Sequence, residues 1–115
     1  MDVIKGIVSF NEERKLDTFN AYAEYKMLEE ELNEFLSAVS MEQEREMIDA
    51  LCDIVVVAVG AMHKLGYNPT RALSQTVQEI TSRQGSFNEE TGKWQKDLEQ
   101  DPLTLYKADY DKARR

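Results

Sequence analysis

The sequence is poor in residues that break helices and in residues that bind soft metals. It has only two prolines and five glycines in 115 residues, and no stretch alternates convincingly between apolar and polar side chains, which argues against a β-rich fold. A single histidine and a single cysteine cannot supply a zinc site or the two Glu-x-x-His motifs of a di-iron helical bundle. The composition therefore favours an all-α chain in which any metal site is built from oxygen ligands.

Positive charge is scarce as well. Fourteen Lys and Arg stand against 22 Asp and Glu, a formal net charge of −8, so a basic surface for nucleic acid is not expected. The lone Cys52 cannot form an internal disulfide, which favours a reducing compartment. No apolar run reaches the ~20 residues of a membrane span, and the first residues lack the apolar core of a signal peptide. We expect a cytoplasmic protein that binds neither nucleic acid nor membrane.

Apolar residues recur at helical spacing along most of the chain and predict a four- to five-helix bundle. We expect one domain over residues 1–115, with a C-terminal arm from about residue 85. Past Gln84 the pattern is that of a polar loop with a turn at Glu90–Gly92, followed by a tail that forms a last helix or an extended arm. The expected helices are 2–10, one capped by Asp17 or Thr18 and ending near Val39, one opened by a capping box at Ser40–Gln43 and ending near Leu65, and one from Asn68-Pro69 to Ser82.

The third of these helices combines an apolar sequence with two carboxylates. From Ile48 to Met62 it is apolar on nearly every side, which is typical of a buried central helix. It nevertheless carries Asp49 and Asp53, four residues apart and so on one face, where like charges repel. A buried pair of carboxylates is unfavourable unless a cation neutralises it, and a divalent cation is the obvious candidate.

A second acidic cluster lies on the preceding helix, where Glu30, Glu31 and Glu34 share a face beside an apolar stripe. Because the loop near residues 40–42 makes the two helices antiparallel, these glutamates and the two aspartates come to a similar height. Four carboxylates there require cations, and hard Mg²⁺ or Mn²⁺ prefers such oxygen ligands. The simpler interpretation of the glutamates alone is a solvated acidic face.

The two motifs together resemble those of the MazG-like nucleotide pyrophosphohydrolases. The first is Glu30-Glu31-Leu32-Asn33-Glu34, and the second is Asp49-Ala50-Leu51-Cys52-Asp53, where the family usually has Glu-Glu-x-x-Asp. Asp49 or Glu46 would therefore have to replace the carboxylate missing at Ala50. The strings SFNEERK, DALCDIVVVAVGAMHKLGYNP and FNEETGKWQKD are similar to those of small phage and mobile-element members. The family belongs to the all-α nucleoside triphosphate pyrophosphohydrolases, alongside dimeric dUTPases and phosphoribosyl-ATP pyrophosphohydrolases.

The resemblance implies a Mg²⁺-dependent enzyme, with Mn²⁺ as a substitute, that hydrolyses a nucleoside or deoxynucleoside triphosphate between its α- and β-phosphates. The products are a nucleoside monophosphate and pyrophosphate. Relatives are homodimers or homotetramers of a helical bundle. The implied metal ligands are Glu31, Glu34, Asp49 and Asp53, and Glu30 or its neighbour Glu31 is expected to orient and deprotonate the attacking water.

A triphosphate also needs cations for its outer phosphates. The aromatic residues Phe10 and Trp94 either stack on a base or, more often, pack in the core or at an interface. Competing hypotheses are a helical interaction module without enzymatic activity and a nucleotide-binding relative without turnover. The candidate substrate-binding residues are Asn11, Arg14, Arg83, Lys93 and Lys96. For Arg83, Lys93 and Lys96, an ordinary solvated surface is at least as good an interpretation.

Overall fold

The computed structural model describes residues 1–115 and divides the chain into two compact units. Unit 1 is Met1–Pro69 together with Arg115, and unit 2 is Thr70–Arg114. Four α-helices carry most of the structure, with one small two-stranded sheet, so the predicted all-α helical fold is confirmed. None of the helices combines the length and the apolar content needed to cross a membrane.

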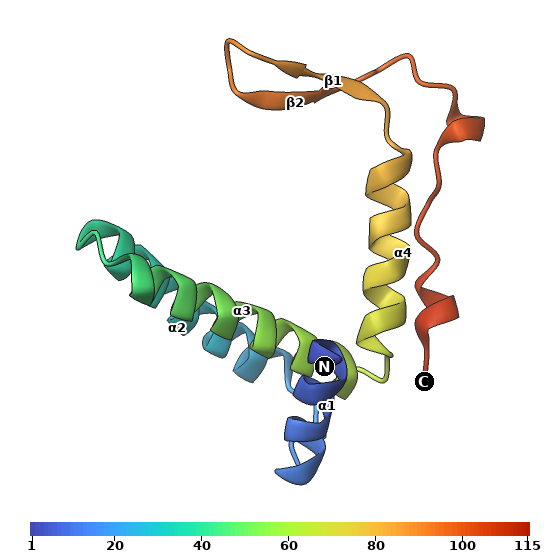
Figure 1. Ribbon diagram of the computed structural model, residues 1–115. Helices are drawn as coiled ribbons and strands as arrows, with labels where there is room; N and C mark the ends of the chain where they lie inside the picture. The colour runs from blue at the N-terminus through green and yellow to red at the C-terminus, as the bar shows by residue number, and fades with distance from the viewer. The chain divides into compact units, whose positions relative to one another are not determined.

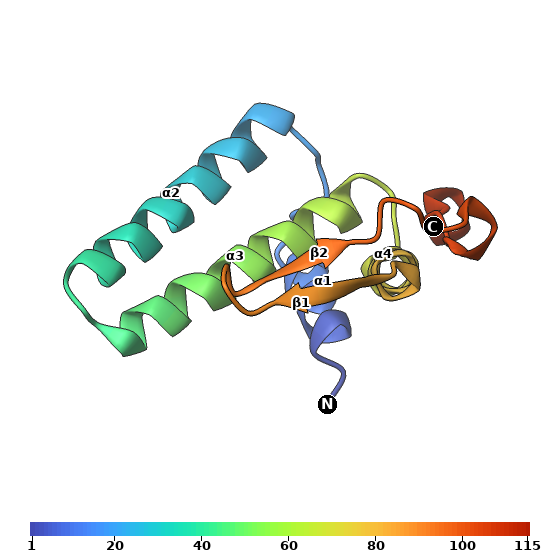
Figure 2. The same ribbon diagram turned by 90° about the horizontal axis from the view of Figure 1, so that it is seen from above.

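Unit 1 holds three helices: α1 (Val3–Glu13), α2 (Ala21–Ser40) and α3 (Glu44–Lys64). Helices α2 and α3 run antiparallel and side by side, joined by a short loop (Figures 1 and 2). Helix α1 packs against α3. The predicted antiparallel pair is therefore present, and it brings the two acidic motifs onto facing helices.

Helices α2 and α3 both begin later in the chain than the sequence predicted. The cap of α2 is Asn20, whose Oδ1 accepts a hydrogen bond from the Ala23 amide at 3.0 Å, and not Asp17 or Thr18. The capping box at Ser40 is wrong because Ser40 is the last residue of α2, where its hydroxyl donates to the Leu36 carbonyl at 3.0 Å. The chain turns only at Glu42, which has a φ of 54°, so α3 begins after it.

Few large apolar side chains of unit 1 are fully buried. The buried apolar residues of α2 and α3 are Ala38, Ala50 and Val59. In contrast, Ile48 is 59% exposed and Val55 is 50% exposed, so the prediction that α3 is buried on nearly every side is wrong for the single chain. Cys52, placed by sequence inside an apolar run, is exposed too.

The position of His63 late in its helix predicts a surface or capping role, but the side chain lies in the interior. Its side chain is nearly buried, with Nε2 at 3.5 Å from a Glu12 carboxylate oxygen. Its backbone carbonyl accepts a hydrogen bond from the Arg115 guanidinium at 2.6 Å. Helix α1 and the last residue pack around the end of α3, and this packing buries His63. The local sequence shows neither contact, so it could not predict the burial.

Unit 2 consists of α4 (Pro69–Ser82), a β-hairpin and a returning tail. The hairpin joins β1 (Gly85–Asn88) and β2 (Lys93–Lys96) with Phe87 opposite Trp94. The predicted turn is confirmed, since Gly92 has a φ of 68°, but the predicted polar loop around it is wrong. Nearly every residue of both strands is exposed, so no apolar–polar alternation marked them in the sequence.

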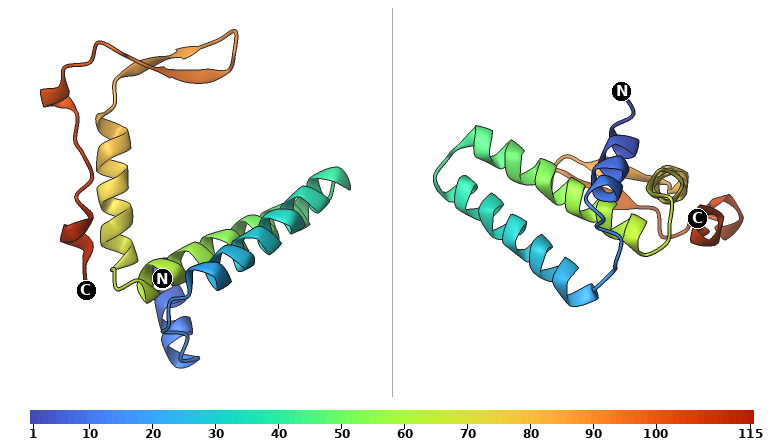
Figure 3. Two further views of the ribbon diagram at one scale, coloured as in Figure 1. Left: turned by 180° about the vertical axis from the view of Figure 1, so that it is seen from behind. Right: turned by 90° about the horizontal axis from the view of Figure 1, so that it is seen from below.

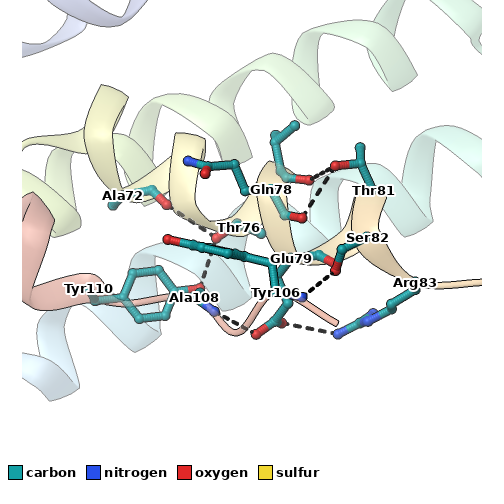
Figure 4. Close-up of polar contacts among 11 residues, drawn as sticks. Ala72, Thr76, Gln78, Glu79, Thr81, Ser82, Arg83, Tyr106, Ala108 and Tyr110 are labelled. Atoms are coloured by element: carbon teal, nitrogen blue, oxygen red, sulfur yellow. Dashed lines mark hydrogen bonds and ion pairs between the residues drawn. The ribbon is translucent and has the colours of Figure 1, made fainter. Parts of the chain in front are cut away.

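The tail after β2 runs back along α4 (Figures 1 and 3). It is extended, with 3₁₀ turns at Pro102–Thr104 and Tyr110–Ala113, which agrees with the extended-arm alternative. Polar contacts with α4 hold it: the Tyr106 amide donates to Ser82 Oγ at 2.8 Å and the Ala108 amide to Glu79 Oε1 at 3.0 Å (Figure 4).

Candidate metal centre

Three carboxylates from two helices form the centre of the candidate site. Glu31 and Glu34 lie on α2, and Asp53 lies on the facing side of α3. One carboxylate oxygen from each lies within 4.8 Å of the other two. Glu31 and Asp53 are half-buried and Glu34 is exposed, so the cluster opens to solvent on one side and has the donor set of a hard cation.

The electrostatics of Glu31 are those of a carboxylate in need of a positive partner. Its Oε2 is buried and has no hydrogen-bond partner. The pKa of Glu31 is raised to about 7. Burial is the largest cause, and a hydrogen bond with Glu34 and the negative charges of Glu34, Asp53 and Glu30 raise the pKa further. A divalent cation would supply the missing partner and offset the repulsion, so the residues fit such an ion.

Asp49, the fourth predicted ligand, does not join the three-carboxylate cluster. It lies one turn from Asp53 toward the α2–α3 loop and lines an adjoining pocket of about 350 Å³. Glu34, Glu46 and Ala50 border the same pocket. Glu34 is thus common to the cluster and the pocket, and the second predicted motif is divided between them.

Comparison with known proteins gives this geometry a context. A family model described as phosphoribosyl-ATP pyrophosphohydrolase matches residues 10–80, a range that contains every carboxylate named above. The chain belongs to the phosphoribosyl-ATP pyrophosphohydrolase family. No curated protein and no solved structure matches it.

Family membership makes the chain a pyrophosphohydrolase that acts on a nucleotide-like substrate, in a family dependent on divalent metals. This family lies within the all-α nucleoside triphosphate pyrophosphohydrolase group to which the motifs pointed. The finer assignment to the MazG-like branch stays a prediction.

A buried ion pair, which sequence reasoning missed, joins α2 to α3. Lys64 Nζ lies 2.6 Å from Glu24 Oε1, and the two side chains are 11% and 6% exposed. Glu31 follows Glu24 by two turns and Asp53 precedes Lys64 by three, so pair and cluster share one seam between the helices. Spacing alone could have placed Glu24 and Glu31 on one face, but not Lys64 opposite.

The predicted substrate-binding residues of unit 1 lie around α1. Asn11 is 5% exposed and packs against Gly60, where an added Cβ would overlap its amide. The guanidinium carbon of Arg14 lies 3.9 Å from the centre of the Phe10 ring, a cation–π contact. Both residues already have protein partners.

The other three predicted substrate-binding residues belong to unit 2. Arg83 follows α4 and pairs with Glu79 at 3.1 Å, while Lys93 and Lys96 lie on β2 and are exposed. Within that unit, Arg83 and Lys96 line the same pocket and Lys93 does not. Their role toward a substrate stays a prediction.

Proposed function

We propose that the chain hydrolyses a nucleoside or deoxynucleoside triphosphate between its α- and β-phosphates and releases a monophosphate and pyrophosphate. The observation that carries the proposal is the convergence of Glu31, Glu34 and Asp53 within 4.8 Å. The family supports the pyrophosphohydrolase chemistry. Triphosphates are proposed because their vicinal phosphates suit a site that holds magnesium through carboxylates.

Mg²⁺ is the proposed ion, with Mn²⁺ as a substitute, because all the available ligands are carboxylate oxygens. Glu31, Glu34 and Asp53 would hold it at the cluster. When bound, the ion would offset the negative charge that develops on the phosphate oxygens. We assign Asp49 to the adjoining pocket as the replacement for the carboxylate missing at Ala50, since Glu46 is already paired with Arg45 at 2.8 Å.

The proposed proton acceptor is Glu30. Its side chain is exposed beside Glu31 on α2 and makes no ion pair or side-chain hydrogen bond, so it is free to orient a water for in-line attack and to take its proton. Glu31, whose pKa is raised to about 7, is the alternative proton acceptor.

We also propose that two or four copies assemble through α1 and α3, in the reducing cytoplasm that the unpaired Cys52 suits. An apolar groove of about 280 Å³ lies between these helices. It is lined by Val3, Ile7, Ile48, Leu51, Cys52, Val55 and Val56. Exposed apolar surface of this kind is typical of an interface. Light scattering at micromolar concentration should give a multiple of the 13.3 kDa chain mass, and Leu51→Glu should lower it; a monomeric wild type contradicts the proposal.

The test of the activity is direct. The protein is incubated with Mg²⁺ and each ribo- and deoxyribonucleoside triphosphate, and with phosphoribosyl-ATP because the family bears its name. Pyrophosphate and orthophosphate are then measured separately. Pyrophosphate from a triphosphate supports the proposal, and Glu44→Gln, which removes an exposed charge of α3 outside the site, should retain it. Pyrophosphate from phosphoribosyl-ATP alone would overturn the substrate class. Nucleotide binding without turnover would favour the non-hydrolysing alternative.

A further inference from the structure

Unit 2 has a pocket of its own, of about 510 Å³, where the tail returns past the end of α4. Its walls are fixed by hydrogen bonds. The Tyr106 amide donates to Ser82 Oγ and the Ala108 amide to Glu79 Oε1 (Figure 4), while the Gln84 amide donates to Gln100 Oε1 at 2.7 Å. Three segments of unit 2 therefore build one defined cavity: the end of α4, the end of β2 and the tail.

The charges around this pocket favour an anion. Arg83, Lys96 and Lys107 line it, against the two carboxylates of Glu79 and Asp97. Glu79 pairs with Arg83, but neither lysine makes an ion pair or a side-chain hydrogen bond. Two unpaired ammonium groups at one pocket are notable in a chain with a net charge of −8.

The uncharged part of the lining combines two glutamines, Gln84 and Gln100, with apolar side chains that suit a ligand larger than a free anion. Leu98, Leu105 and Tyr106 contribute to the walls, and the volume lies in the range of pockets that enclose small organic ligands. Strand geometry selects between the lysines of β2: Lys93 and Lys96 are three residues apart and so point to opposite faces, and only Lys96 lines the pocket.

We propose that this pocket binds a nucleoside monophosphate, with Lys96 and Lys107 on the phosphate and Leu98, Leu105 and Tyr106 against the nucleoside. The site goes beyond the proposed hydrolysis, because none of its residues belongs to the acidic cluster. All of them but Glu79 also lie outside the family match at residues 10–80. Lys107, which sequence reasoning did not single out, becomes a ligand-binding residue.

The test uses the full chain with a metal chelator, so that the acidic cluster does not contribute to nucleotide binding. Calorimetric titrations with AMP, adenosine and inorganic phosphate separate the phosphate from the nucleoside. AMP should bind, and adenosine and phosphate should each bind at least about tenfold more weakly. Lys96→Ala and Lys107→Ala should each weaken AMP binding by about tenfold through loss of a charge-assisted hydrogen bond.

Lys112→Ala is the matched control, because Lys112 is an exposed lysine of the same unit that does not line the pocket; its AMP affinity should equal that of the wild type. Circular dichroism checks that each variant folds. The proposal is overturned if adenosine or phosphate binds as tightly as AMP, if AMP does not bind, or if the Lys112 variant loses as much affinity as the pocket variants. Pyrophosphate release from a triphosphate is measured separately, so failure here leaves the proposed hydrolysis standing.

Discussion

The Glu31 carboxylate of α2 meets the Asp53 carboxylate of α3 within 4.8 Å, with Glu34 completing the cluster. Neither helix carries this site alone. Because Glu31 Oε2 is buried without a partner, the folded chain keeps an unfavourable arrangement that a cation would relieve.

Cation binding should depend on pH through Glu31. Its pKa is raised to about 7, chiefly by burial, and a cation binds the deprotonated carboxylate. Mg²⁺ affinity measured by calorimetry should therefore increase as the pH rises from 6 to 8, with protons released on binding below about pH 7. A Mg²⁺ affinity that is flat over this range would contradict the assignment of Glu31 as a ligand.

The same shift has the opposite sign for the stability of the metal-free protein. The folded-state pKa of Glu31 lies above its ordinary value of 4.5, so the folded state holds a proton that the unfolded state releases. The free energy of unfolding should fall as the pH rises from about 4.5 to about 7. Urea melts with a chelator should show a smaller decrease for Glu31→Gln, whereas Glu13→Gln, an exposed acid of α1, should behave as the wild type does.

The ion pair between Glu24 and Lys64 should be costly to break on one side. Lys64→Met leaves a buried carboxylate unpaired and should lower the free energy of unfolding by about 3–5 kcal/mol. The double variant Glu24→Leu, Lys64→Met should recover most of this loss. Lys26→Met is the control, because its pair with Glu29 is exposed and should change stability by at most about 1 kcal/mol. Equal losses in the free energy of unfolding from Lys64→Met and Lys26→Met would show that the buried pair does not stabilise the packing of α2 on α3.

The packing of α1 on α3 is tested by two glycines. In Gly60→Ala the new methyl group would overlap the Asn11 amide, so we expect a loss of about 1–3 kcal/mol from overpacking. In Gly6→Ala nothing lies within 4 Å of the new methyl group, and a helix-interior glycine is removed, which should stabilise by about 0.5–1 kcal/mol. Thermal melts measure both; if Gly60→Ala stabilises as Gly6→Ala does, α1 does not pack on α3 through Asn11.

The sequence predicted the helices because their apolar spacing is local, and it predicted the approach of the two acidic motifs because a short loop forces an antiparallel pair. It misplaced Ser40, since a serine followed by a glutamine three residues later fits a capping box whether or not the preceding helix has ended. It did not reveal the hairpin, whose exposed strands lack alternation, or the Glu24–Lys64 pair, whose partners lie forty residues apart.

The sequence also could not show that Asp49 would be separated from the other three predicted ligands, because that separation depends on contacts between helices. Asp49 and Asp53 share a helical face, but whether each reaches α2 depends on the relative height of the helices, which tertiary packing sets. In the structure Asp53 lies level with Glu31, while Asp49 lies a turn away beside Glu46 and Ala50. Spacing along one helix predicts the face on which a residue lies. It does not predict which residue of the neighbouring helix that residue contacts.

The central claim is that the carboxylates of Glu31, Glu34 and Asp53 hold a divalent cation, and a Mg²⁺ titration of the wild type and of Asp53→Asn tests it most directly. The wild type should bind Mg²⁺ at pH 8. Asp53→Asn should lose at least about tenfold in affinity and all pyrophosphate release, while its circular dichroism stays helical because the change removes charge repulsion. An Asp53→Asn protein that binds Mg²⁺ as the wild type does would contradict the account.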